Sequence, residues 1–248
     1  MTAQDTYKEL VNRLKKVNLI YSCASVLGWD ERTYMPRGGG QHRAEQLGLI
    51  SAMGHEHFTD PKIGELLSTL EKSDYMKDED SPEAANIRET RHQYDKGTKL
   101  PTDLVEEITK VTTLAQGEWV TARKNSDFKS FIPWLEKVIG LQQKKADAYG
   151  YEGEPYNALL DDYEPGADTK EVEAVFADLR NELVELLGKI KDAPKKPDVS
   201  IVERDYDVKL QNIFGESVAA AMGFDFNEGR LDITTHPFCS GFGPGDTR

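Results

Sequence analysis

The segment TKEVEAVFADLRNELVELLGKIK, residues 169–191, decides the fold class, because its apolar side chains recur every three or four positions. An α-helix turns once per 3.6 residues, so side chains at this spacing lie on one face. Asp168 and Glu171 stand three residues apart at the start of the segment, which resembles a capping box. The segment therefore predicts a long amphipathic helix with a core-facing stripe. The stripe consists of Val172, Val175, Phe176, Leu179, Leu183, Leu186, Leu187 and Ile190.

The same spacing continues on both sides of this segment and predicts several more helices. Asp60-Pro61 and Ser81-Pro82 each join an N-cap residue to a proline at the first helical position, so a helix is expected after each pair. Gly28 and Gly54 are expected to end the first and second helices. A first predicted helix carries Tyr7, Leu10, Val11, Leu14, Val17, Ile20 and Tyr21, and a second, over about 41–53, has Ala44, Leu47, Ile50 and Met53 inward. Another is expected to be capped by Thr102 or Asp103, and two more are expected over about 128–149 and about 204–222.

The pattern changes after Gly223. GRLDITTH, residues 229–236, alternates apolar and polar side chains and predicts a short strand, whereas SGFGPGDTR, residues 240–248, predicts a glycine-rich loop. The sequence therefore predicts an all-α fold of long amphipathic helices with one short β-strand near the C-terminal end. No boundary signal divides the chain, so we expect a single helical domain over residues 1–248.

Composition excludes several classes of protein. Charged residues make up 30% of the chain and its formal net charge is −13, a field that repels phosphate backbones and anionic membrane surfaces. We therefore expect no nucleic-acid partner and no membrane partner, and no apolar stretch approaches the length of a membrane span. The start MTAQDTYKEL carries no secretory signal, and Cys23 and Cys239 are expected to be reduced thiols. These features favour a cytoplasmic location.

Three patterns could indicate chemistry but have simpler interpretations. His55-Glu56-His57 is the nearest approach to a zinc motif, but the two histidines would point about 200° apart on a helix, and we expect surface-loop residues. Gly38–Gly40 is not followed by the G-K-[ST] of a phosphate-binding loop, so a flexible turn is expected. Carboxylates gather at Asp161, Asp162 and Glu164, and at Asp205 and Asp207. The first group predicts a helix end running into a turn, with paired acid–base chemistry as the alternative.

The C-terminal stretch offers a different kind of candidate site. His236-Pro237-Phe238 ends the predicted strand, and Asp246 and Arg248 follow the glycine-rich loop. An arginine can bind a carboxylate through two parallel hydrogen bonds, which suits recognition of the free C-terminus of a peptide. These side chains could line a cleft.

Four stretches together resemble the Taq-type zinc metallocarboxypeptidase family of thermostable carboxypeptidases. They are WDERTYMP at 29–36, GGGQHRAEQLGLIS at 38–51, PYNALLDDYEPG at 155–166 and GFDFNEGRLDITTHPFCSGFGPGDTR at 223–248. Within the last stretch, His236-Pro237-Phe238 looks like the family's H-P-F motif, and Asp246-Thr247-Arg248 looks like the opening of its D-x-R-x-T motif. The resemblance covers nearly the whole chain and matches the N-terminal portion of that family.

The resemblance implies a zincin-like helical fold with a deep groove, and release of single amino acids from peptide C-termini with broad specificity. It implies homodimers, and a zinc ion held by an H-E-x-x-H helix and a downstream glutamate. Substrate-binding roles fall on His236, Pro237, Phe238, Asp246 and Arg248. Arg248 becomes a candidate contact for the terminal carboxylate of the substrate, and His236 a hydrogen-bond donor in the groove.

The sequence also departs from the family pattern. H-E-x-x-H is absent from the 248 residues and the chain ends inside D-x-R-x-T, so no catalytic or metal residue is expected here. We therefore expect an incomplete copy of the peptidase that is inactive alone and leaves apolar helix faces uncovered. The alternative is a naturally short, non-catalytic relative that acts as an interaction or regulatory module.

Overall fold

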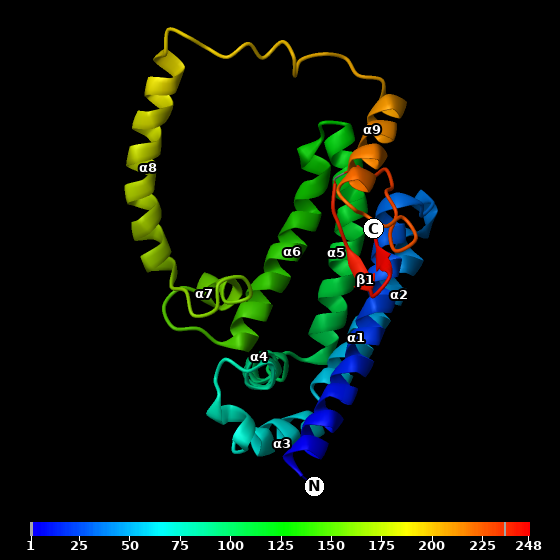
Figure 1. The fold of residues 1–248 in the computed structure, drawn as a ribbon, viewed down its shortest axis with the longest axis vertical. Coiled ribbons are helices and arrows are strands. Elements are labelled where there is room, and N and C mark those ends of the chain that lie inside the picture. Colours follow the sequence, from blue (N-terminus) through cyan, green and yellow to red (C-terminus); the bar gives the residue numbers. More distant parts are fainter. Residues whose placement is uncertain (1, 236) are drawn as a thin grey trace. The chain divides into compact units, whose positions relative to one another are not determined.

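The computed structural model describes residues 2–235 and 237–248 (Figure 1). Helices dominate these residues, and a single pair of short strands closes the described chain, so the predicted all-α class with minor β-structure near the C-terminal end is confirmed. Contacts divide the chain into two compact units, Met1–Gly150 with Asp232–Arg248, and Tyr151–Leu231. The single domain over residues 1–248 stays a prediction.

The first unit is a set of long helices followed, much later in the sequence, by a β-hairpin. Helix α1 packs on α2 and α3, α2 packs also on α5, and α5 packs on α6. Helix α6 matches the predicted span of 128–149 closely. The elements are α1 (Ala3–Thr33), η1 (Arg37–Gly39), α2 (Gly40–Phe58), α3 (Pro61–Leu70), η2 (Asp74–Lys77), α4 (Pro82–Gly97), α5 (Thr102–Lys124), α6 (Phe128–Tyr149), β1 (Gly241–Gly243) and β2 (Asp246–Thr247).

The best-buried apolar cluster of this unit joins α1, α3 and α4. Its side chains are at most 2% exposed, and burial of this extent stabilises a fold by roughly 1.5–3 kcal/mol for each large aliphatic side chain. The cluster consists of Leu10, Ile63, Leu66, Leu67, Leu70 and Ile87. It fixes the N-terminal half of α1 against α3.

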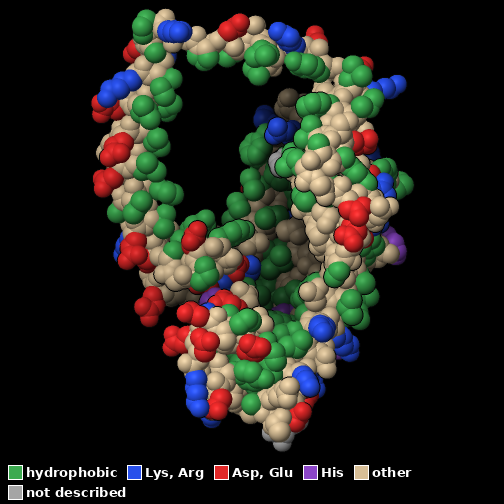
Figure 2. Space-filling view, in the orientation of Figure 1, with side chains coloured by type: hydrophobic (Ala, Val, Ile, Leu, Met, Phe, Trp, Pro, Cys, Tyr) green, Lys and Arg blue, Asp and Glu red, His purple; other side chains and the backbone are tan. Residues whose placement is uncertain are grey.

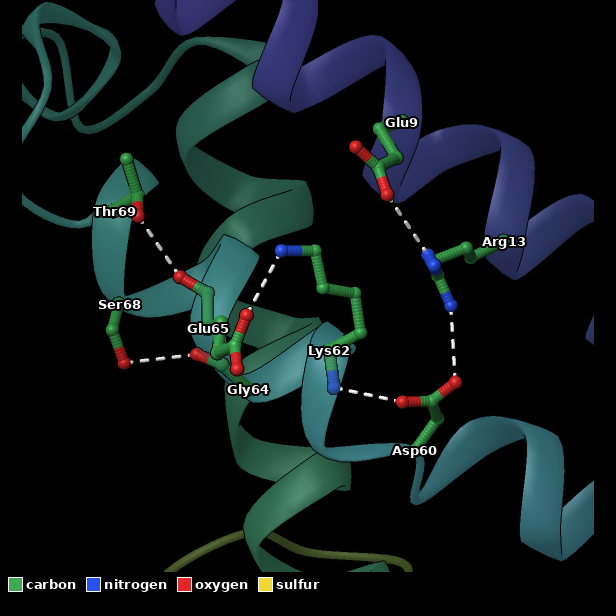
Figure 3. Close-up of polar contacts among 8 residues, drawn as sticks. All are labelled: Glu9, Arg13, Asp60, Lys62, Gly64, Glu65, Ser68 and Thr69. Carbon is green, nitrogen blue, oxygen red and sulfur yellow. Dashed lines mark hydrogen bonds and ion pairs between the residues drawn. The ribbon is translucent and has the colours of Figure 1, made fainter. Parts of the chain in front are cut away.

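Asp60 starts α3 and also ties that helix to α1 (Figure 3). One carboxylate oxygen accepts a 2.8 Å hydrogen bond from the backbone N–H of Lys62, as an N-cap residue should. The other oxygen lies 3.0 Å from the Arg13 guanidinium, which also pairs with Glu9 at 3.2 Å. The predicted helix starts at Asp60-Pro61 and Ser81-Pro82 are both confirmed. The N-cap of α5 is Pro101, so the predicted capping by Thr102 or Asp103 is wrong.

Both glycines predicted to end helices lie inside them. Helix α1 continues past Gly28 to Thr33, and α2 continues past Gly54 to Phe58. A Cβ atom on Gly54 would lie 2.6 Å from the ring of Tyr21, so glycine is present because α1 and α2 approach closely there. A glycine costs a helix about 1 kcal/mol relative to alanine, and tertiary packing overrides that preference.

Two further predictions about α2 are wrong for related reasons. Because the helix continues past Gly54, His55 lies in its last turn, is only 6% exposed, and has Nε2 2.9 Å from the carbonyl oxygen of Leu100. It is therefore a hydrogen-bonded core residue rather than a surface-loop residue. Met53, predicted to face inward, is 43% exposed. Gly38–Gly40 is not a flexible turn but forms the end of η1 and the first residue of α2.

The second unit contains α7 (Tyr156–Leu160), α8 (Thr169–Asp192) and α9 (Val208–Ala221). Asp161 follows α7 and accepts a 3.0 Å hydrogen bond from the backbone of Gly166, which confirms the predicted helix end and turn. Asp168 caps α8 by accepting a 2.8 Å hydrogen bond from the backbone of Lys170. Asp207 caps α9 in the same way.

The predicted stripe of α8 is present but exposed. Phe176 is 62% exposed and Leu187 is 61% exposed, and no residue of α8 is buried. Figure 2 shows hydrophobic side chains along the length of this helix. An amphipathic helix gains most of its stability from packing its apolar face, and the second unit by itself does not cover this face of α8.

The strand predicted at 229–236 is wrong, since residues 230–235 carry no strand and residue 236 lies outside the described residues. The β-structure lies instead in the stretch predicted as loop. Strands β1 and β2 pair in antiparallel fashion, and Ser240 and Arg248 exchange backbone hydrogen bonds of 2.6 and 2.8 Å. Gly245 has φ = +77°, a conformation that glycine adopts at no steric cost, and this allows the tight turn.

Candidate substrate-binding site

The first unit contains an open cavity of about 810 Å³. One part of its wall comes from the end of α1 and from η1, another from the middle of α5 and from α6, and a third from the segment before β1. The lining residues include Glu31, Arg32, Met35, Arg37, Gln41, Thr112, Gln116, Trp119, Phe131, Val138, Thr234, Thr235 and Phe238. The cavity therefore combines charged groups from α1, η1 and α5 with apolar and hydroxyl groups, as ligand sites commonly do.

The stretch WDERTYMP forms the last turns of α1 and the residues that follow them. Trp29 is 9% exposed and packs against the Tyr34 ring, with centroids 5.6 Å apart. Asp30 lies 2.7 Å from the Arg43 guanidinium, which also donates to the carbonyl of Leu27. The Arg43 side chain is 12% exposed, so this ion pair fixes the end of α1 against α2 from a protected position.

Segment 232–248 is attached to the same end of α1. The Tyr34 hydroxyl donates a 2.6 Å hydrogen bond to Asp232, and the Thr234 hydroxyl donates a 3.1 Å hydrogen bond to the carbonyl of Arg32. The Arg32 guanidinium lies 5.3 Å from the centroid of the Phe238 ring, within the range of a cation–π interaction. These contacts place Phe238 on the cavity wall.

The positive charge of the Arg248 guanidinium is paired with a carboxylate, and the side chain is largely buried. Its Nε donates to Asp246 Oδ1 at 2.7 Å and its Nη2 donates to Asp246 Oδ2 at 2.9 Å, so the pair is bidentate. The guanidinium carbon lies 4.3 Å from the Trp29 ring centroid and 5.2 Å from that of Phe242, and the side chain is 19% exposed. A guanidinium has five N–H donors, and Asp246 accepts from two of them.

Glu31 is the carboxylate that α1 contributes to the cavity wall. Burial raises the pKa of the Glu31 carboxyl, because a charged carboxylate loses hydration there. The positive charges of Arg32 and Arg43 act in the opposite direction and lower it by less. The cavity therefore has a carboxyl group that takes up a proton more readily than an exposed glutamate does.

The structure brings together some of the sequence-predicted site residues. Phe238 lines the cavity, whereas Asp246 and Arg248 pair with each other but are not among the residues that line it. Pro237 is exposed beside Phe238, and His236 lies outside the described residues. The substrate-binding roles of these five residues stay predictions.

Sequence reasoning missed Trp29 and Arg32 as members of this site. Both lie in WDERTYMP, and their spacing of three residues places them on one face of α1. Each contacts the C-terminal segment, Trp29 through Arg248 and Arg32 through Phe238. The sequence therefore shows that Trp29 and Arg32 share a face of α1. It does not show what that face contacts, because Arg248 and Phe238 lie about 200 positions away.

Within residues 2–235 and 237–248, no three His, Cys, Asp or Glu side chains gather closely enough to hold a metal ion. A protein zinc site takes at least three such ligands, so the described side chains do not fit one. None of the described helices is long and apolar enough to cross a membrane.

A family profile described as carboxypeptidase Taq (M32) metallopeptidase matches residues 9–248. The chain belongs to this family. The resemblance noted in the sequence is thus confirmed. M32 enzymes are metallocarboxypeptidases by this description, so the family implies hydrolysis with a metal cofactor.

Two M32 relatives show how much of such a protein the chain represents. The chain is 37% identical to thermostable carboxypeptidase 1 of Thermus thermophilus, in an alignment that covers 100% of this chain and 50% of that protein. It is 31% identical to carboxypeptidase 1 of Bacillus subtilis, over 97% of this chain and 48% of that protein. The chain spans about half the length of the M32 relatives it matches.

Solved M32 structures share the fold. The BsuCP crystal structure superposes with a TM-score of 0.89 at 29% identity, over 98% of this chain and 49% of that chain. The apo-Mg structure of Pyrococcus furiosus carboxypeptidase superposes with a TM-score of 0.76 at 31% identity, again over 98% of this chain and 49% of that chain. The helical arrangement is therefore that of one half of an M32 carboxypeptidase.

Proposed function

We propose that this M32 chain forms part of the peptide-binding groove of a zinc carboxypeptidase that releases single C-terminal amino acids with broad specificity. The observation that carries the proposal is the fixed Arg248 guanidinium, held by Asp246 at 2.7 and 2.9 Å beside the segment that lines the cavity. A guanidinium with donors to spare is the side chain best suited to a peptide carboxylate. The M32 family match supports the reaction class.

In this proposal Arg248 binds the terminal carboxylate of the peptide. Asp246 orients the guanidinium, and Phe238 and Pro237 shape the groove next to it. His236 donates a hydrogen bond within the groove. These roles follow the motif positions of the family and the location of Phe238 on the cavity wall.

The metal is proposed to be zinc, held by residues other than those of this chain, because H-E-x-x-H does not occur in the 248 residues. Zinc would supply a polarised carbonyl and an activated water for hydrolysis. This chain alone is therefore proposed to be inactive as a peptidase. The whole protein is proposed to act as a cytoplasmic homodimer.

The second candidate function is a non-catalytic interaction module, and its supporting observation is one that an incomplete peptidase predicts as well. The apolar face of α8 is exposed, with Phe176 at 62% and Leu187 at 61%. A large exposed apolar face marks a surface that another polypeptide covers. Such a module would bind a partner through α8 and would not need Arg248.

A chimeric enzyme separates these two functions. The 248 residues replace the matched half of Bacillus subtilis carboxypeptidase 1, and release of the C-terminal amino acid from an N-blocked tripeptide is measured. We expect the chimera to be active and the 248-residue chain alone to be inactive. Arg248→Ala in the chimera should lower kcat/KM by on the order of 10- to 100-fold, the value of a hydrogen bond to a charged group.

Each component of the proposal has a result that overturns it. Peptide hydrolysis by the purified 248-residue chain would refute the proposal that the zinc is held by residues other than those of this chain. Unchanged kinetics of Arg248→Ala would refute the carboxylate role. A folded but inactive chimera would favour the interaction module, and Leu187→Asp on α8 should then abolish binding to the partner.

A further inference from the structure

The C-terminal hairpin is too small to hold a charged side chain rigidly by its own contacts. Strands β1 and β2 contain three and two residues, and glycine occurs at positions 241, 243 and 245. A two-stranded hairpin of this size is marginally stable by itself in water. Arg248 follows β2 directly, so its rigidity depends on contacts outside the hairpin.

Trp29 provides that contact from the far end of the sequence. Strand β1 packs on α1 (Figure 1), and the Arg248 guanidinium carbon lies 4.3 Å from the Trp29 ring centroid. An arginine held within about 6 Å of an indole face gains roughly 0.5–2 kcal/mol, more where water is excluded. Trp29 is 9% exposed and packs on Tyr34, so the indole is itself fixed.

Two different parts of the guanidinium are thereby fixed. Asp246 accepts hydrogen bonds at the Nε–Nη2 edge, and Trp29 contacts the guanidinium through its ring. Immobilising a flexible side chain costs conformational entropy when a ligand binds. An arginine that is already immobile avoids that cost at the moment of binding, and its unused donors remain for the ligand.

A second contact of the same kind sets the register of α1 against the C-terminal segment. Arg32, one helical turn after Trp29, lies 5.3 Å from the ring centroid of Phe238. The two contacts are reciprocal: in the Trp29–Arg248 pair α1 provides the aromatic ring, and in the Arg32–Phe238 pair α1 provides the cation. A rotation or slip of α1 would break both contacts together.

We propose that Trp29 is a positioning residue for carboxylate recognition: its indole holds the Arg248 guanidinium in the orientation that binds the C-terminus of a peptide. The proposal rests on the proposed function of Arg248 and adds the residue on which that function depends. Trp29 does not touch the substrate and acts through Arg248.

The test uses the 248-residue chain and two probes, N-acetyl-dialanine with a free C-terminal carboxylate and the same peptide as a C-terminal amide. Affinity is measured by NMR titration, and the resonance of the Arg248 Nε–H group reports the position of the guanidinium. The wild-type chain should prefer the carboxylate probe. Trp29→Leu should shift the Arg248 resonance, because the ring current is lost, and should weaken carboxylate binding by about 2- to 30-fold.

Conservative variants distinguish positioning from simple core packing. Trp29→Tyr and Trp29→Phe keep an aromatic face, so affinity should follow the order Trp, Tyr, Phe, Leu. This series remains informative if Trp29→Leu does not fold. Trp134→Leu is the matched control, because Lys137 lies 4.5 Å from that ring on α6 and the pair is not part of this site. It should leave carboxylate affinity unchanged.

The possible failures are distinguishable. If Arg248→Lys abolishes the preference for the carboxylate but the Trp29 variants change neither affinity nor the Arg248 resonance, Trp29 is not a positioning residue and the proposed role of Arg248 stands. If the wild-type chain does not prefer the carboxylate over the amide, the role of Arg248 is refuted, and the inference about Trp29 with it.

Discussion

The Tyr34 hydroxyl donates a 2.6 Å hydrogen bond to the Asp232 carboxylate, and the two residues are 198 positions apart in the sequence. This bond joins the end of α1 to the start of the segment that carries the H-P-F and D-x-R residues. The Thr234 hydroxyl adds a second bond, to the carbonyl of Arg32. The conformation of the candidate site therefore depends on residues at both ends of the chain.

Replacing Tyr34 by phenylalanine removes the hydroxyl and keeps the ring. The variant should lose about 0.5–1.5 kcal/mol of local stability, since Tyr34 is 60% exposed and water replaces part of the bond. Hydrogen exchange of the hairpin amides of Ser240 and Arg248 should accelerate several-fold. Tyr163→Phe, which removes a hydroxyl from an 84% exposed ring in the second unit, is the control. Equal protection in all three proteins would contradict the anchoring role.

Asp60 performs two functions that substitutions can separate (Figure 3). Asp60→Asn keeps an N-cap acceptor for Lys62 but loses the ion pair with Arg13, and should cost about 0.2–1 kcal/mol. Asp60→Ala loses both and should cost about 1 kcal/mol more. Urea unfolding measures the difference. Asp74→Asn, in an ion pair whose carboxylate is 86% exposed, should be nearly neutral. An alanine variant as stable as the asparagine variant would show that the cap contributes nothing.

Two leucine-to-alanine substitutions test how differently the units bury their apolar residues. Leu67 is 0% exposed in the first unit, so Leu67→Ala should cost about 2–5 kcal/mol. Leu187 is 61% exposed on α8, and Leu187→Ala should change stability by less than about 0.5 kcal/mol. Far-UV circular dichroism follows the unfolding of the helices of both units, and tryptophan fluorescence follows the first unit separately, since Trp29, Trp119 and Trp134 all lie there. A comparable cost for the two variants would mean that α8 is covered in solution.

Local sequence signals predicted the helices well but failed where tertiary contacts decide. Helix starts at Asp60-Pro61 and Ser81-Pro82 depend on residues next to each other, and both were correct. Gly54 resembles a helix stop, yet its role is to admit the Tyr21 ring, which no local pattern reveals. Alternation at 229–236 predicts a strand, but the strand pairing lies at β1 and β2, where the turn at Gly245, whose φ is +77°, folds one strand back onto the other.

The candidate site was predictable only in part. Phe238 and Arg248 were found because short motifs of the M32 family mark them, whatever their surroundings. Trp29 and Arg32 were missed as site members, because their importance comes from contacts with residues about 200 positions away. Sequence spacing within α1 places both on one face, but only the folded chain shows what that face contacts.

Glu31 should make the stability of the first unit depend on pH, which an ordinary surface glutamate would not do. Burial raises the pKa of the Glu31 carboxyl, and the positive charges of Arg32 and Arg43 only partly oppose this. The folded state therefore holds the proton more tightly than the unfolded state, whose glutamate pKa is about 4.3. As pH rises from that value through the folded pKa, the ionised carboxylate destabilises the folded state increasingly. Below the unfolded pKa this penalty is absent.

Glu31→Gln should therefore stabilise the first unit at pH 7, because the amide stays neutral at every pH. The urea midpoint of the variant should exceed that of the wild type at pH 7, and the two should converge below about pH 4, where Glu31 is protonated in both states. Glu228→Gln changes the net charge equally at an exposed position of the second unit, and controls for general repulsion in a chain of net charge −13. A difference that grows on acidification would show that Glu31 is stabilised as a carboxylate, with Arg32 and Arg43 outweighing burial.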